Sequence, residues 1–300
     1  MATAMTQPPQ VDLREPRSWR SLKDRIATVI MVLAFVVVII PLGFVLYTVI
    51  AKGASIISWR FLTSNIPVNV APPSVGGMGP AVLGTILITA LTTVIFVPLG
   101  VLGAIYLNEY GGKRPLARFI GFMADVMTGV PSIVMGLFIF SIWVIRFGVN
   151  GYSGLAGAFA LGCLMLPIVI RSSEEMLKLV PDSLREAAYA LGATKARVTL
   201  TTVLPAALSG ITSGALLAVA RIAGETAPLL FTILITFTPV PNIFHGPNTA
   251  LPTQIFANAE SPYVGAQARA WGAALTLIAI AFILMIAARL ITGRVARFSR

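Results

Sequence analysis

Charged side chains are scarce in this sequence of 300 residues. Asp, Glu, Lys and Arg make up only 11% of it, whereas a soluble domain usually carries about 25%. Hydrophobic residues make up 57%, and the mean hydropathy is +0.88. These values exclude a soluble globular domain and predict a polytopic membrane protein.

The residues that form disulfides or bind metals are nearly absent. The chain has one cysteine, Cys163, in an apolar run, and one histidine, His245, in a predicted loop. Cys163 has no partner for an internal disulfide, and neither residue has the companions that a metal site needs. We therefore expect neither a disulfide nor a metal.

The phosphate-binding loop of nucleotide-binding proteins is also missing. No G-x-x-x-x-G-K-[ST] occurs in the chain. Any ATPase that works with this chain must therefore be a separate polypeptide, and we expect the chain not to be an enzyme by itself.

Long apolar segments are abundant. A helix needs about 20 apolar residues to cross the hydrocarbon core. On that measure the sequence predicts an all-α protein with six spans, at residues 26–50, 80–107, 119–145, 152–171, 207–237 and 270–291. The expected organisation is an N-terminal tail (1–25), the first span, an outer loop (51–79), a core of five helices (80–291) that contains an inner loop (172–206), and a basic tail (292–300).

The basic residues are distributed unevenly between the two sides of this predicted bundle. Seventeen of the 22 lysines and arginines fall in the tails and loops of one side, which includes both termini. The positive-inside rule then places both termini in the cytoplasm. The net charge of +11 follows from this topology, since the basic residues form no single stripe that would suggest nucleic acid.

The inner loop contains the stretch "VPDSLREAAYALGATKARVTLTTVLP", residues 180–205. Ser183 and Glu186 match the S-x-x-E capping box and predict a helix that starts there. Gly192 is expected to end it, and a second helix is expected near 195–203. An apolar face of the first helix is formed by Leu184, Ala187, Ala188 and Leu191. Spacing alone leaves open whether this face binds a partner or packs on the protein's own loops.

Two charges interrupt the fifth predicted span. Arg221 and Glu225 lie four residues apart in "ARIAGETAPLLFT", and each costs about 2.5–3.5 kcal/mol at bilayer depth on insertion scales. A guanidinium presents a fork of donors that matches the oxygens of an oxyanion, so Arg221 suits an anion pathway. Glu225 is expected to pair with Arg221 when no anion is present and to favour anion release otherwise. The alternative is a buried ion pair that only fixes helix packing.

Several other residues are weaker candidates for the same pathway or its gate. Pro228 is expected to bend the helix at Gly224, because proline cannot bond to that carbonyl and its ring crowds it. Arg171 ends the fourth span, where a positive charge also serves topology. Asp125 is expected to cap a helix or to pair with a basic residue. Thr128 and Ser132 can bond an oxyanion, although such hydroxyls usually bond the backbone.

The inner loop resembles the EAA loop of ABC importer permeases. The matching residues are Glu186, Ala187, Ala188, Gly192, Leu204 and Pro205, with Thr202 departing from the usual isoleucine. "GPAVLGTILIT" (79–89), "GVPSIVMGLF" (129–138) and "LLAVARIAGETAPLLFT" (216–232) are similar to the phosphate-specific permeases of high-affinity phosphate importers. The likeness covers residues 76 to 290.

This resemblance implies a fold, a function and a set of partners. The fold is that of an ABC type I importer permease, a multi-pass protein of the cell membrane surrounded by lipid. The implied partners are a homologous second permease, a dimer of ATP-binding subunits that receives the coupling helix and binds the ATP, and an extracytoplasmic phosphate-binding protein. The chain itself then needs no cofactor, phosphate is the substrate, and Arg171 lies at the cytoplasmic exit.

Three alternatives remain from the residues themselves. A permease for sulfate or molybdate would use Arg221 in the same way. An ion-coupled secondary transporter would use Arg221 and Glu225 as a proton relay. A purely structural assembly protein would need neither charge for transport.

Overall fold

The computed structural model describes residues 19–68 and 70–298, and these residues form helices and loops without strands. Most of the predicted N-terminal tail, residues 1–18, and the last two residues of the predicted basic tail lie outside the described residues. The chain divides at Thr48 into an N-terminal unit and a main unit.

The N-terminal unit consists of most of helix α1, Trp19–Gly53, whose last turns belong to the main unit. α1 begins seven residues before the predicted first span. Its side chains from Leu22 to Leu46 are exposed, and from Ile26 onward they are apolar around the whole circumference of the helix apart from Thr28. A helix that is apolar on every side is typical of a membrane span.

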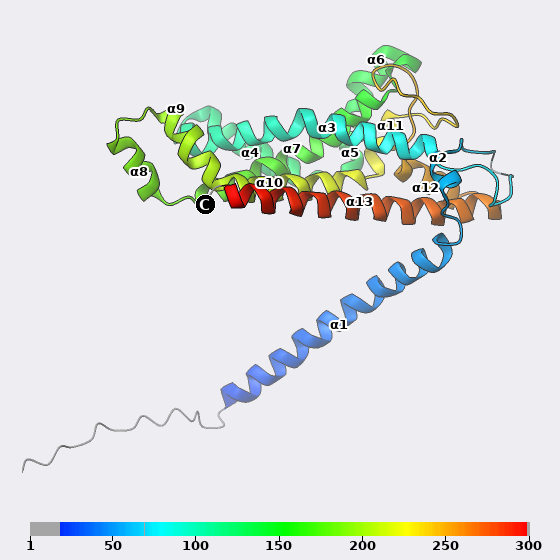
Figure 1. Ribbon diagram of the computed structural model, residues 1–300, viewed down its shortest axis with the longest axis horizontal. Helices are drawn as coiled ribbons and strands as arrows, with labels where there is room; N and C mark the ends of the chain where they lie inside the picture. The colour runs from blue at the N-terminus through cyan, green and yellow to red at the C-terminus, as the bar shows by residue number, and fades with distance from the viewer. Residues whose placement is uncertain (1–18, 69, 299–300) are drawn as a thin grey trace, which may run out of the picture. The chain divides into compact units, whose positions relative to one another are not determined.

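The main unit is a bundle of long helices (Figure 1). The long ones are α3 (Gly79–Ile105), α7 (Gly154–Lys178), α10 (Leu204–Ala223) and α13 (Val264–Phe298). The shorter ones are α2 (Trp59–Thr63), α4 (Pro115–Gly129), α5 (Ser132–Ile139), α6 (Ile145–Phe147), α8 (Asp182–Ala190), α9 (Lys195–Val198), α11 (Ala227–Thr232) and α12 (Leu251–Ala259). Three π-helical segments are η1 (Tyr106–Gly111), η2 (Phe140–Val144) and η4 (Thr199–Val203), and η3 (Gly148–Gly151) is a 3₁₀ turn.

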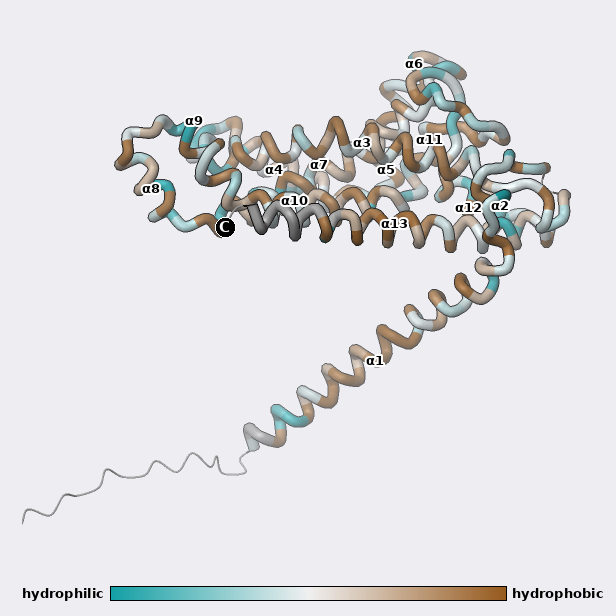
Figure 2. The backbone as a smooth tube through the Cα atoms, in the orientation of Figure 1, coloured by the Kyte–Doolittle hydropathy of each residue, from teal (hydrophilic) through white to brown (hydrophobic). Residues whose placement is uncertain are grey.

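Helix α7 lies at the centre of this bundle. It packs against α3, α10, α4, α5 and α11, and 61% of its most apolar stretch is buried. The α8–α9 hairpin lies at one end of the bundle, and α2 and α12 lie at the other (Figure 1). Hydrophobic residues run along α13, whereas hydrophilic ones gather at α9 and α2 (Figure 2). Six helical stretches of the described chain are long and apolar enough to cross a membrane, which confirms the predicted number.

The third predicted span is not one helix. α4 ends at Gly129, Val130 and Pro131 are extended with ψ of 130° and 139°, and α5 starts at Ser132. A residue that precedes proline is disfavoured in the helical conformation, because the proline ring clashes with its backbone. The continuous helix predicted over 119–145 was therefore wrong.

The fifth predicted span is also interrupted, and the predicted bend at Pro228 was wrong. α10 ends at Ala223, where the Gly224 N–H donates to the carbonyl of Arg221 over 3.3 Å, and α11 begins at Ala227. Pro228 lies in the first turn of α11, where its missing N–H has no helical partner to lose. Proline here starts a new helix instead of kinking an old one.

The inner loop forms the predicted helical hairpin, with one correction at its start. α8 begins at Asp182 after Pro181, and the expected capping box of Ser183 and Glu186 is not formed. Ser183 is already inside the helix, so its hydroxyl is not at the capping position. The second predicted helix is present as α9, which continues through η4 into α10.

Gly192 ends α8 as predicted. It has φ of +79°, its N–H donates to the carbonyl of Tyr189 over 2.9 Å, and the Ala193 N–H donates to that of Ala188 over 3.3 Å. These two bonds form a Schellman motif, which needs the left-handed conformation that glycine adopts without strain.

We expect Gly192→Ala to destabilise the α8–α9 hairpin by about 1–2 kcal/mol, the usual cost of a side chain in the left-handed region. An added Cβ would meet nothing within 4 Å, so the destabilisation comes from backbone strain alone and not from a steric clash. Gly192→Asn should cost clearly less, because asparagine tolerates this conformation. Hydrogen exchange of the amides of residues 188–193 measures both effects, and equal exchange in the Ala and Asn variants would contradict the assignment.

At the other end of the bundle, the predicted outer loop 51–79 contacts the start of α13. α13 starts at Val264, six residues before the predicted span, and this places Arg269 inside the helix. The buried Arg269 side chain donates to the carbonyls of Val68, Ala71 and Pro72 over 3.1–3.4 Å. The arginine therefore fastens the predicted outer loop 51–79 to α13.

Candidate functional site

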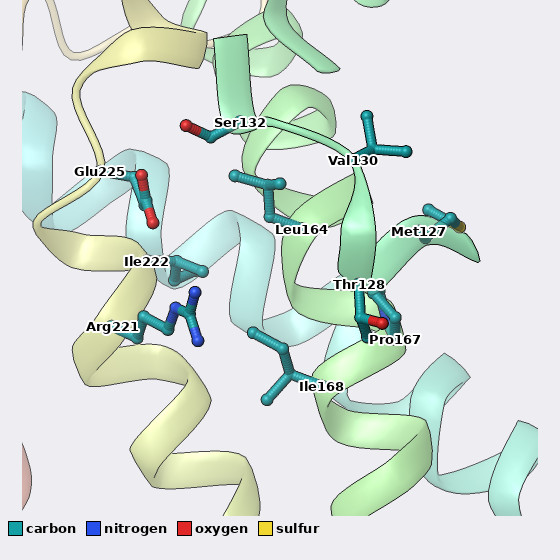
Figure 3. Close-up of a pocket in the computed structure, with 10 residues that line it drawn as sticks. All are labelled: Met127, Thr128, Val130, Ser132, Leu164, Pro167, Ile168, Arg221, Ile222 and Glu225. Carbon is teal, nitrogen blue, oxygen red and sulfur yellow. The ribbon is translucent and has the colours of Figure 1, made fainter. Parts of the chain in front are cut away.

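The two interrupted helices open onto one pocket on the side of α7. The pocket holds about 220 Å³, enough for a small anion with several waters. The ends of α4 and α10, the start of α5 and the middle of α7 enclose it (Figure 3). Its lining residues are Met127, Thr128, Val130, Ser132, Leu164, Pro167, Ile168, Arg221, Ile222 and Glu225.

Arg221 and Glu225 both line this pocket, but they do not pair. Among residues 19–68 and 70–298 neither takes part in an ion pair, so the predicted Arg221–Glu225 contact was wrong. The reason is the break in the chain: a spacing of four brings side chains together only in a continuous helix, and α10 ends at Ala223. Both side chains reach from the α10 side into the space bounded by Leu164 and Ile168 (Figure 3).

This geometry leaves a positive charge facing a cavity. Arg221 is exposed and Glu225 half-buried in the isolated chain, and apolar side chains of α7 form the opposite wall. A guanidinium whose donors are not used by a carboxylate can offer them to an incoming oxyanion. The observed arrangement therefore supports an anion site at Arg221 more directly than the predicted ion pair did.

The short helices α5 and α11, which follow the two breaks, are held against each other by a glycine. A Cβ added to Gly136 would lie 2.6 Å from Pro228 Cα and 3.0 Å from the Pro228 carbonyl oxygen. These are backbone atoms, so they cannot move aside cheaply. The close approach sets the distance between α5 and α11, and the first residue of α5, Ser132, lines the pocket.

We expect Gly136→Ala to destabilise the protein by about 1–3 kcal/mol, the usual cost of overpacking. Gly129→Ala, at the end of α4, is the matched control, because a Cβ there would meet nothing within 4 Å. Thermal unfolding of the solubilised protein should show a lower midpoint for the Gly136 variant alone. A similar midpoint for both would mean that α5 and α11 are not held at this point.

Arg171 lies on the same side of α7 as the pocket, one turn further along. Leu164, Ile168 and Arg171 follow at intervals of four and three residues, which is one face of a helix. The face that forms the apolar wall of the pocket therefore leads directly to Arg171.

Both terminal nitrogens of the Arg171 guanidinium are engaged, by α4 and by its own helix. Nη2 lies 2.6 Å from Asp125 Oδ1 and donates to the carbonyl of Gly121 over 2.7 Å, and Nη1 lies 2.6 Å from Glu174 Oε2. The expectation that Asp125 pairs with a basic residue is confirmed. Asp125 is 66% exposed and Glu174 only 12%, so Asp125 is the partner that a competing anion could replace more easily.

Glu174 and Lys178 are members of this cluster that the sequence reasoning missed. Glu174 Oε1 lies 2.7 Å from Lys178 Nζ, one turn further along α7. The spacing of Arg171, Glu174 and Lys178 at i, i+3 and i+7 was the available signal, but the fourth span was predicted to end at residue 171. The helix continues to Lys178 and brings all three onto one face.

The two hydroxyl residues of the pocket differ. The Thr128 hydroxyl donates to the carbonyl of Asp125 over 2.6 Å, the ordinary backbone bond of a helical threonine. Ser132 is the first residue of α5, next to the break, and is partly buried in the pocket. Of the two, Ser132 is placed better to bond an anion.

The coupling hairpin, residues 182–203, exposes most of the predicted apolar face. α8 has no buried residue, Leu191 is 89% exposed and Leu184 is 44% exposed. Ala188 departs from the prediction, because it packs inward on the cluster around Leu177 and Val203. Packing on the protein's own loops therefore accounts for only one edge of the face. Leu204 and Pro205 start α10.

Arg185 of α8 is a further residue that the sequence reasoning did not single out. Its side chain is only 14% exposed and contacts Glu109, which lies far away in the sequence. No local pattern signals a contact over such a separation.

Known proteins resemble the chain along most of its length. Residues 97–297 match the family model of the binding-protein-dependent transport system inner membrane component. The chain is 42% identical over 273 residues to the phosphate transport system permease protein PstA 1 of Mycobacterium tuberculosis H37Rv, covering 91% of this chain and 88% of the relative. It is 43% identical over 283 residues to the phosphate transport system permease protein PstA of Yersinia pestis, covering 94% of each.

Solved structures share the fold at lower sequence identity. A bacterial alginate ABC transporter, in complex with an alginate pentasaccharide-bound periplasmic protein, matches with a TM-score of 0.61 at 12% identity, over 93% of this chain and 98% of that one. An inward-facing MetNI methionine ABC transporter matches with a TM-score of 0.55 at 20% identity, over 71% and 91%. The predicted ABC importer permease fold is confirmed. The chain belongs to the binding-protein-dependent transport system inner membrane components and, within them, to the family of phosphate transport system permease proteins.

Proposed function

We propose that this chain is the permease subunit of an ATP-driven phosphate importer and forms half of its translocation pathway. The observation that carries the proposal is Arg221, a guanidinium without a carboxylate partner among the described residues, in a pocket between two interrupted helices. The relatives named for phosphate transport supply the identity of the anion. The positive charge of Arg221 in the pocket explains why an anion fits there.

The pocket suits an anion that passes through. Interrupted helices that border a cavity are a recurrent way to build a substrate site inside a membrane, because the freed backbone groups face the cavity instead of lipid. Arg221 attracts the phosphate, and Glu225 in the same pocket repels it. The site therefore favours charge recognition with weak retention.

Arg171 and its partners form the inner gate in this proposal. The ion pair between Arg171 and Asp125 joins α7 to α4 beyond the pocket. A phosphate that moves along the α7 face reaches Arg171 next and competes with the exposed Asp125 for its donors. Separation of α4 from α7 would then open the way to the cytoplasm.

The partners follow from the family and from the coupling hairpin. A homologous second permease completes the pathway, a dimer of ATP-binding subunits receives Leu184, Ala187 and Leu191, and an extracytoplasmic binding protein delivers the phosphate. Both termini and the hairpin are cytoplasmic, in agreement with the excess of basic residues on that side. The chain binds no ATP and catalyses no reaction of its own.

Competition between oxyanions tests the substrate. Cells that rely on this importer should take up labelled phosphate, and a hundredfold excess of sulfate or molybdate should leave uptake unchanged. An excess of unlabelled phosphate should abolish it. Inhibition by sulfate or molybdate as strong as that by phosphate would assign the pathway to another oxyanion.

A further inference from the structure

We propose that the π-helical segment η1 at the end of α3 receives the motion of the coupling hairpin. Glu109 and Tyr110 of η1 are the positioning residues on the receiving side, and Arg185 and Lys195 are those of the hairpin. This inference rests on the proposed function, and it identifies the residues that transmit the motion of the hairpin to α3.

Arg185 joins three segments of the chain through its guanidinium. Its Nη2 lies 3.1 Å from Glu109 Oε1 and donates to the carbonyl of Leu177 over 2.9 Å. Its Nη1 donates to the carbonyl of Val180 over 2.5 Å and to Asp182 Oδ1 over 3.1 Å. One side chain of α8 thereby holds the end of α7 and the end of α3 together.

The contact with Glu109 is shielded from water. The side chain of Glu109 is 6% exposed and that of Arg185 is 14% exposed. The same carboxylate oxygen of Glu109 accepts from Asn108 Nδ2 over 2.8 Å, which fixes its orientation. A carboxylate buried to this degree requires its cation, so Glu109 and Arg185 move together.

The next residue of η1 holds the other helix of the hairpin. Lys195 Nζ, at the start of α9, lies 5.2 Å from the centre of the Tyr110 ring, a cation–π contact. Two consecutive residues of η1 therefore contact both helices of the hairpin. If Arg185 only capped α7, its bonds to Leu177 and Val180 would be explained. The contact of Arg185 with Glu109 and that of Lys195 with Tyr110 would not be.

The hairpin is also continuous with a second π-helical segment. α9 runs through η4 into α10, whose far end carries Arg221. α3, which ends in η1, packs along α7, whose face forms the opposite wall of the pocket. A displacement of α8 is thus delivered to α10 through the chain and to α3 through Glu109 and Tyr110. Both points are π-helical, and π turns within helices occur frequently at functional sites.

The test is the number of phosphates transported per ATP hydrolysed by the whole complex in proteoliposomes. Glu109→Gln keeps the shape and an accepting oxygen but removes the charge, and it should lower this number roughly tenfold, because a neutral amide holds Arg185 less strongly than a carboxylate does. Tyr110→Leu should lower it less. ATP hydrolysis and the copurification of the ATP-binding subunits should be retained in both.

Asp182→Asn is the matched control. Asp182 contacts the same guanidinium as Glu109 but is 89% exposed, so its loss should leave the number unchanged. An unchanged number in the Glu109→Gln variant would overturn the proposal. If the parent complex moves no phosphate, the proposed function fails instead.

A second measurement needs neither variants nor phosphate. Hydrogen exchange of the parent complex, with and without bound ATP, should change in residues 106–111 whenever it changes in residues 182–190. A change in α8 with none in η1 would overturn the proposal even if the Glu109 variant did not assemble.

Discussion

Replacing Arg221 by glutamine is expected to lower phosphate uptake by roughly a hundredfold. Glutamine retains hydrogen-bonding groups but removes the charge and the fork of donors. Hydrogen bonds to charged groups contribute about 1.5–3 kcal/mol each, and a loss of about 3 kcal/mol corresponds to a factor of roughly a hundred. Uptake of labelled phosphate by the assembled complex measures the effect.

Arg221→Lys separates charge from shape. Lysine keeps the positive charge but offers a point charge in place of the planar fork, so uptake should lie between that of the parent and that of Arg221→Gln. Assembly should be intact in both variants, because Arg221 has no ion-pair partner among the described residues whose loss would leave a buried carboxylate. Normal uptake in Arg221→Gln would assign Arg221 a packing role and leave the pocket without its central residue.

Replacing Leu191 by glutamate is expected to uncouple the chain from its ATPase. Leu191 follows α8, directly before the glycine that ends it, and is 89% exposed, so the change does not disturb the bundle itself. A charge at the centre of an apolar contact should weaken binding of the ATP-binding subunits by at least 2 kcal/mol, about thirtyfold. The amount of ATP-binding subunit that copurifies with the membrane subunits measures this.

Val264→Glu is the control for that experiment. Val264 is 76% exposed and starts α13 at the opposite end of the main unit (Figure 1). The same charge at Val264 should leave copurification unchanged. Equal retention of the ATP-binding subunit in the Leu191 and Val264 variants would show that α8 is not its docking surface.

The general architecture could be predicted from the sequence because its signals are local. Six apolar runs predicted the number of helical stretches that are long and apolar enough to span a membrane, and Gly192 ends α8 in the left-handed conformation that only its lack of a side chain makes easy. The likeness to ABC importer permeases identified the family from short motifs around Glu186 and Arg221. These features depend on residues that are close together in the chain.

The details of the site depend on tertiary packing and could not be predicted in the same way. Pro131 and Pro228 were visible in the sequence, but proline can kink a helix or separate two helices, and the choice depends on what packs against the break. Here Gly136 lets α5 and α11 approach each other, and the two separate helices are stabilised together. Once the fifth span is divided, the spacing of Arg221 and Glu225 no longer implies a contact.

Contacts across the sequence were likewise invisible to pattern reasoning. Asp125 reaches Arg171 from another helix, and Glu109 reaches Arg185 over an even longer separation. In both cases the charged residue is visible in the sequence, but the distant residue that pairs with it is not. The predicted boundaries of the spans concealed Glu174 and Lys178 as well, because α7 extends beyond the apolar run into polar residues that face the same cluster.

Phosphate is expected to cross the membrane through this subunit at the expense of ATP. The direct measurement is accumulation of labelled phosphate in proteoliposomes that contain the complete complex. Its binding protein is added on the side of the membrane opposite the coupling hairpin. Accumulation should require ATP on the side of the coupling hairpin and should persist when a proton uncoupler is added. Accumulation that needs no ATP and collapses with the uncoupler would contradict the account and would identify an ion-coupled transporter.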